Sequence, residues 1–122
     1  MKAAAAGLVA LVLLMLPACG GSSVAQPAGS IKVTMTEYHF DPTDLSAPSG
    51  KVVFYLVNAG SVAHDLVITK DDGSVVARSE LVSAGDQMVF TVDSIAAGKY
   101  KTLCDQPGHA DSGMKGALTI SK

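Results

Sequence analysis

The sequence lacks several features that would point to common functions. Its 9 Lys and Arg are outnumbered by 11 Asp and Glu, which gives a formal net charge of −2 and no basic patch for nucleic acid. From residue 31 onward no segment shows the 3.6-residue apolar period of an amphipathic helix. No internal repeat, phosphate-binding loop or second domain is visible either. What remains is one small domain built from strands.

Alternating apolar and polar residues predict those strands. Six such runs are present, at 31–36, 51–57, 64–69, 87–92, 100–104 and 116–121. Turn sequences rich in Gly and Asp separate them, for example at 71–74 and 83–86. Many short strands at regular spacing predict an all-β fold, a single Greek-key antiparallel β-sandwich. The residues from 31 to 122 suffice for one small core and no more.

The first eighteen residues have the layout of an export signal peptide. Lys2 precedes an apolar stretch over 3–16, which is followed by small residues. That stretch is too short for a spanning helix. Residues 16–19 (Leu-Pro-Ala-Cys) are similar to a bacterial lipobox, in which Cys19 is acylated and becomes the mature N-terminus. An ordinary secretory signal that is cut nearby is the alternative.

The segment 19–30 is predicted to be a flexible tether. It is rich in Gly, Ser, Pro and Ala, and it has no apolar periodicity with which to bury a core. With Cys19 lipidated, the domain is expected to be exported and anchored at a membrane surface, facing the periplasm or the cell exterior.

The most informative residues lie near the C-terminus. Cys104, His109 and Met114 have the spacing Cys-x4-His-x4-Met, and His64 lies upstream. A thiolate and two imidazoles in a plane, with a long bond to a thioether, is the ligand set that holds copper for one-electron transfer. Zinc gains little from a thioether, so the methionine favours copper.

Each of these residues alone has a plainer interpretation. A lone Cys is usually a small buried hydrophobe, a lone His a satisfied polar group, and a Met core filler. A disulfide between Cys19 and Cys104 is a further alternative in an exported protein. Cys19 lies at the end of the predicted export signal and outside the predicted strands, which makes that disulfide the weaker alternative. Turn formers within 104–114 disfavour a regular element that would need Met114 as core.

Several motifs give the chain a family resemblance. The turn Asn58-Ala59-Gly60 precedes His64, and a segment of the form Gly-x-Tyr-x-x-x-Cys lies at 98–104. Residues 37–42 (EYHFDP) are similar to an opening strand and turn. Together these features resemble the cupredoxin family over residues 31–122. The four-and-four ligand spacing is most similar to that of auracyanins and rusticyanin.

The resemblance implies one copper ion that cycles between Cu(II) and Cu(I). His64, Cys104, His109 and Met114 are its expected ligands. Asn58 and Asp65 are expected to surround these ligands rather than bind the ion. Many family members have Asn where this chain has Asp65, and a carboxylate there could accept backbone N–H groups while its charge favours Cu(II).

The expected function is therefore that of a type 1 (blue) copper electron carrier. Its partners would be redox proteins such as a cytochrome or an oxidase or reductase, and the chain is expected to be a monomer. Copper storage or delivery is the alternative, although the 5 Met are not clustered as in a copper-releasing segment. No enzyme activity is expected, because the only other histidine, His39, leaves too few ligands for a second copper centre. Uncharged residues around His109 (Val62, Ala63, Pro107, Gly108 and Ala110) are expected to form an electron port.

Overall fold

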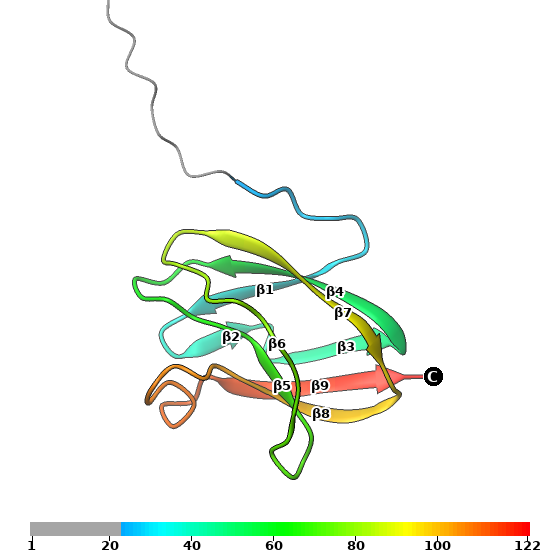
Figure 1. The fold of residues 1–122 in the computed structure, drawn as a ribbon. Coiled ribbons are helices and arrows are strands. Elements are labelled where there is room, and N and C mark those ends of the chain that lie inside the picture. Colours follow the sequence, from blue (N-terminus) through cyan, green and yellow to red (C-terminus); the bar gives the residue numbers. More distant parts are fainter. Residues whose placement is uncertain (1–22) are drawn as a thin grey trace, which may run out of the picture.

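The computed structural model describes residues 23–122, so the predicted export signal (1–18) and the predicted lipidation site Cys19 lie outside the described residues. The described part forms two sheets packed face to face (Figure 1). Among residues 23–122 no helix is both long and apolar enough to span a membrane. The strands are β1 (Ile31–Thr36), β2 (His39–Asp41), β3 (Asp44–Pro48), β4 (Gly50–Asn58), β5 (Val67–Thr69), β6 (Val75–Arg78), β7 (Gln87–Ile95), β8 (Gly98–Leu103) and β9 (Lys115–Ser121).

Both sheets are mixed, which corrects one detail of the predicted antiparallel sandwich. The four-stranded sheet has the order β2-β1-β4-β7, and the five-stranded sheet has the order β3-β9-β8-β5-β6. The pairs β1/β4 and β3/β9 are parallel, while the other pairs are antiparallel. The chain crosses from β2 in one sheet to β3 in the other, then returns along β4 beside β1. Alternation of side chains identifies a strand and its buried face, but it does not identify the neighbouring strand.

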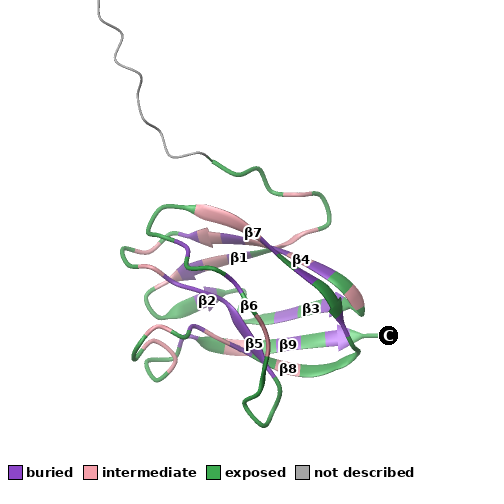
Figure 2. Ribbon diagram, in the orientation of Figure 1, coloured by how far each residue is buried: buried purple, intermediate pink, exposed green. Residues whose placement is uncertain are grey.

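Buried positions occur on strands of both sheets (Figure 2, purple), and their apolar side chains form one hydrophobic core. On β4, alternate residues are buried, and Phe54 stacks on Phe90 of β7 with ring centroids 5.8 Å apart. Burial of each such side chain stabilises the fold by about 1.5–3 kcal/mol. The core continues to the end of β4, where the buried polar residue Asn58 takes the place of an apolar one.

The structure differs from the predicted strands in two further respects. β3 and β6 were not predicted, because they are short and do not show a clear period-two run, while β2 lies within the predicted opening strand and turn at 37–42. His64 does not open a strand. It forms an isolated bridge with Val82, and β5 begins only at Val67.

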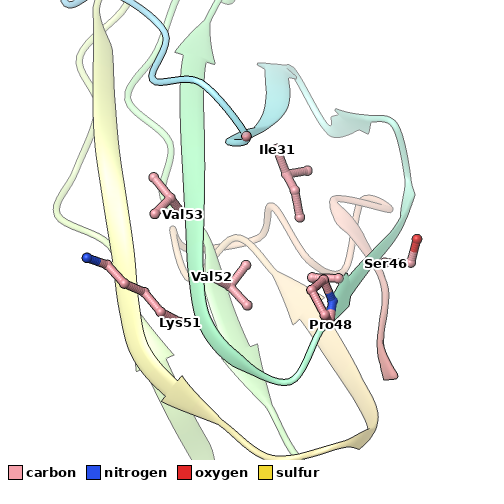
Figure 3. A pocket seen from close by; sticks show the side chains of 8 residues that line it. Ile31, Ser46, Pro48, Lys51, Val52 and Val53 are labelled. Carbon is pink, nitrogen blue, oxygen red and sulfur yellow. The ribbon is translucent and has the colours of Figure 1, made fainter. Parts of the chain in front are cut away.

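Residues 23–30, which belong to the predicted tether, lead into β1. The Tyr55 hydroxyl of β4 donates a hydrogen bond of 2.8 Å to the Val24 carbonyl. A cavity of about 280 Å³ lies where this segment meets the end of β3 and the start of β4 (Figure 3). Its lining residues are Gly29, Ile31, Ser46, Ala47, Pro48, Lys51, Val52 and Val53, none of which is a predicted metal ligand.

Candidate metal centre

The predicted ligands lie at the end of the sandwich opposite this cavity. Three connections meet there: the turn between β1 and β2, the segment 59–66 between β4 and β5, and the loop 104–114 between β8 and β9 (Figure 1, orange loop). The ends of strands in two packed sheets therefore position predicted ligands that are up to 50 positions apart in sequence.

Three donor atoms come together in this region. His64 Nδ1, Cys104 Sγ and His109 Nδ1 all lie within 4.8 Å of one another. The two nitrogens are 3.2 Å apart, and the sulfur is 3.9 Å from His64 and 3.5 Å from His109. His64 and Cys104 are fully buried, and His109 is half-buried.

This triangle fits a trigonally bound metal ion. Bonds of about 2.0 Å to nitrogen and about 2.3 Å to sulfur, spread at about 120°, place the nitrogens about 3.5 Å apart and each nitrogen about 3.7 Å from the sulfur. The observed separations of 3.2, 3.5 and 3.9 Å lie close to those values. Two imidazoles and one thiolate in such a plane are the donors of a type 1 copper site.

Met114 lies beside this triangle and is fully buried. The Cys104 N–H donates to the Met114 carbonyl, and the Met114 N–H donates to the His109 carbonyl, both at 3.0 Å. The loop between them turns at Gly108 and Gly113, whose φ angles of +80° and +111° favour glycine. A short hydrogen-bonded loop thus holds three predicted ligands together, and the Met114 thioether would complete a donor set that favours copper over zinc.

His64 is held in place by its backbone and by Asn58. Its N–H donates to the Val82 carbonyl at 3.1 Å, and its carbonyl accepts from the Val82 N–H at 2.8 Å. Asn58 Nδ2 donates to the carbonyls of Val62 and Val82, both at 2.8 Å, and Asn58 Oδ1 accepts from the Gly60 N–H at 2.9 Å. The buried side-chain amide of Asn58 therefore fixes the turn that positions His64.

Asp65 connects the two ligand segments. Its Oδ1 accepts a hydrogen bond of 2.7 Å from the Asp105 N–H, next to Cys104. Its Oδ2 lies 3.6 Å from Nη1 of Arg78, which also pairs with the Asp105 carboxylate. The side chain of Asp65 is 5% exposed and that of Arg78 is 45% exposed, so the carboxylate is buried beneath a partly exposed cation.

Burial raises the pKa of the Cys104 thiol, and backbone N–H groups of Asp65 and Gln106 act in the opposite direction. The raised pKa keeps the thiol protonated near neutral pH in the metal-free protein. Binding of a metal ion to the thiolate must therefore release a proton.

Glu37, in the turn between β1 and β2, was not predicted to belong to the site. Its Oε1 lies 3.1 Å from Nε2 of His64 and accepts hydrogen bonds from the N–H groups of Ser61 at 2.8 Å and Val62 at 3.1 Å. The pKa of Glu37 is lowered to about 2, chiefly by the hydrogen bond from the Ser61 N–H. The acid precedes His64 by 27 residues, so no local motif links the two in sequence.

The outer side of the site is apolar and partly exposed. The Tyr38 ring meets the His109 ring edge-on, with centroids 4.9 Å apart and planes at 72°. Tyr38 and Val62 are each 43% exposed. Pro107 and Gly108 are exposed, while Ala63 and Ala110 are half-buried. His39 is exposed and does not belong to the His64, Cys104, His109 cluster.

Thr102 of β8 is buried, and within the described residues its hydroxyl has no hydrogen-bond partner. Its neighbour across the β8/β9 ladder is Gly116, where an added Cβ would lie 2.0 Å from the Thr43 carbonyl oxygen and 3.1 Å from the Thr102 hydroxyl. Within residues 23–122, Cys104 forms no disulfide.

Comparison with known proteins gives consistent matches. The family model of the cupredoxin-like domain matches residues 6–120. No curated protein sequence matches. Auracyanin B is similar over 84% of this chain and 96% of its own, with 26% identity and a TM-score of 0.71. Reduced auracyanin from Roseiflexus castenholzii covers 80% of this chain and 100% of its own, with 21% identity and a TM-score of 0.69. Auracyanin A, a "blue" copper protein from Chloroflexus aurantiacus, covers 74% and 99%, with 24% identity and a TM-score of 0.62.

Proposed function

The chain belongs to the cupredoxin-like domain family, and on this basis we propose that it is an electron carrier with one type 1 copper ion that alternates between Cu(II) and Cu(I). His64, Cys104 and His109 would hold the ion in a plane, and Met114 would provide the weak axial bond. The observation that carries the proposal is the buried triangle of two nitrogens and one sulfur, with sides of 3.2–3.9 Å.

The protein's contribution is to hold its own donor atoms still. When bound, copper supplies a centre that takes up and gives up one electron. Hydrogen bonds between Cys104, His109 and Met114, and the bridge between His64 and Val82, restrict movement of the ligand segments. Complete burial of His64, Cys104 and Met114 excludes water. A rigid, dry set of donors keeps reorganisation small, which favours fast transfer.

The route for the electron is proposed to pass through His109. Its ring is the half-buried member of the triangle, it meets the partly exposed ring of Tyr38, and the exposed Pro107 lies in the same loop. A largely apolar surface over a ligand edge, which also holds the partly exposed Glu37 carboxylate, suits brief contact with a redox protein, such as a cytochrome or an oxidase or reductase. One electron enters from a reduced partner and leaves to an oxidised one, with no bond made or broken in the protein.

Burial of the donors also favours electron transfer over copper delivery. A protein that hands copper to another needs ligands that a partner can reach, whereas His64, Cys104 and Met114 have no exposed surface. Release of the ion would require the loop 104–114 to open and the hydrogen bonds at both of its ends to break. The storage or delivery function is therefore the less favoured alternative.

The location of the domain rests on sequence alone. We propose that residues 1–18 are an export signal, that Cys19 is lipidated, and that the tether holds the domain at a membrane surface outside the cytoplasm. The proposal is supported by the apolar stretch over 3–16 and by the residues Leu-Pro-Ala-Cys at 16–19.

Protein-film voltammetry of the copper-loaded domain tests the electron-carrier function. A reversible one-electron wave, together with rapid electron exchange between oxidised and reduced protein, is expected. An irreversible wave, with loss of copper on reduction, would support copper delivery and contradict the proposal.

A further inference from the structure

We propose that Glu37 is a positioning residue for this copper site: its carboxylate fixes the ring of His64 with Nδ1 facing the metal, and its negative charge lowers the reduction potential. The proposal rests on the proposed function for the second of these roles. The first concerns the metal-free protein and is independent of copper.

The contacts of Glu37 place a carboxylate behind a predicted ligand. The Oε1 atom of Glu37 is 3.1 Å from Nε2 of His64. The other ring nitrogen of His64, Nδ1, faces Nδ1 of His109 at 3.2 Å. Glu37 therefore lies on the side of the His64 ring that faces away from the triangle. The His64 side chain is fully buried, and that of Glu37 is 31% exposed. The carboxylate thus fills the space between a buried ring and the surface.

This contact determines where the ring carries its proton. A carboxylate can only accept a hydrogen bond, so Nε2 of His64 must be the donor. In the neutral ring the Nδ1 atom then has no proton, and its lone pair is free for a metal ion. A carboxylate that accepts from the second nitrogen of a metal-binding histidine also orients the ring and raises its basicity.

Glu37 is itself held by the backbone. The same Oε1 atom accepts from the N–H groups of Ser61 and Val62, so three donors converge on one oxygen. Gly60 permits this approach, because an added Cβ would lie 2.3 Å from Glu37 Oε1. The turn between β1 and β2 is thereby tied to the segment that carries His64.

The charge of Glu37 is less compensated than that of Asp65. Asp65 lies 3.6 Å from Arg78, whereas among residues 23–122 no Lys or Arg pairs with the Glu37 carboxylate. The N–H groups of Ser61 and Val62 both donate to this carboxylate, and such hydrogen bonds favour its charged form. A negative charge beside a ligand favours the more highly charged Cu(II) state and lowers the potential.

Nuclear magnetic resonance of the metal-free protein tests the positioning role. In the wild type and in Glu37→Gln, whose amide oxygen still accepts, the Nε2–H proton of His64 is expected to be protected and visible. In Glu37→Ala that signal is expected to disappear through exchange with water. Gly60→Ala retains the charge of Glu37 but displaces its carboxylate, so the Nε2–H signal of His64 should disappear in this variant too. Equal protection of the Nε2–H proton in all four proteins would overturn the positioning role.

Voltammetry of the copper-loaded proteins tests the charge. Glu37→Gln is expected to raise the potential by the equivalent of about a threefold or larger change in the Cu(II)/Cu(I) ratio, where a tenfold change is about 59 mV. Asp93→Asn is the control, because it removes one exposed charge from β7, near the opposite end of the sheet. A Glu37→Gln shift no larger than that of the control would overturn the electrostatic role. Failure of the wild type to form a blue site would instead contradict the proposed function, while the metal-free measurement would still decide the positioning role.

Discussion

Asp65 Oδ1 accepts a hydrogen bond of 2.7 Å from the backbone N–H of Asp105, which joins the segment of the first predicted ligand to that of the thiolate. The sequence had suggested such a contact between a carboxylate and backbone N–H groups. It had not suggested Arg78, which lies 3.6 Å from the other Asp65 oxygen and offsets its charge.

Replacement of Asp65 and Arg78 should move the potential in opposite directions. Asp65→Asn retains an oxygen for the Asp105 N–H but removes a negative charge, so the potential should rise. Arg78→Gln removes a positive charge and should lower it. Because Arg78 is 45% exposed and offsets Asp65, we expect both shifts to be small. Voltammetry of both variants measures the reduction potential. Shifts of the same sign would contradict the charge effects assigned to Asp65 and Arg78.

Met114→Leu should retain the blue colour and raise the reduction potential. Leucine fills a similar volume but has no sulfur, and loss of a weak electron donor disfavours Cu(II). Absorption spectra and voltammetry of the wild type and the variant are the measurements. A lowered potential would rule out Met114 as the axial ligand.

Gly116→Ala should destabilise the domain by about 1–3 kcal/mol, the usual cost of overpacking. The new Cβ would lie 2.0 Å from the backbone carbonyl oxygen of Thr43, which cannot move as a flexible side chain would. Urea unfolding measures the effect, with Lys115→Ala as the control, because Lys115 is exposed in the same strand. If Gly116→Ala and Lys115→Ala were equally stable, β3 and β9 would be able to move apart with no loss of stability, and the prediction would be wrong.

Cys19→Ser should release the protein from the membrane fraction of cells that express it. The change removes the thiol that lipidation would modify and leaves the apolar stretch over 3–16 intact. Fractionation of the variant against the wild type is the measurement. Mass spectrometry that showed an unmodified N-terminus after Cys19 would contradict lipidation.

Much of the fold was predictable because its main strands alternate clearly. On the long strand β4 every second residue from Val52 to Asn58 is buried, and the predicted cupredoxin family and β-sandwich are confirmed. The parallel pairs β1/β4 and β3/β9 could not be predicted, since side-chain alternation is the same for either direction of pairing. The short strands β3 and β6 depend on tertiary pairing rather than on their own sequence.

The site was predictable where its residues are close in sequence. Cys104, His109 and Met114 share one loop with a recognisable spacing, and the structure brings the first two together with His64. That all four bind copper stays a prediction. Glu37 was missed because its partners Ser61 and His64 are 24 and 27 residues away, and a single acid in a turn usually faces solvent.

Addition of Cu(II) to the wild-type domain and to Cys104→Ser tests the central claim most directly. The wild type should take up one copper ion and become intensely blue through charge transfer from the thiolate. Cys104→Ser should remain colourless or pale while its β-sheet circular dichroism is unchanged, because a hydroxyl cannot replace the thiolate and the strands do not depend on it. A pale wild type, or a blue colour that survives in Cys104→Ser, would contradict the type 1 copper site.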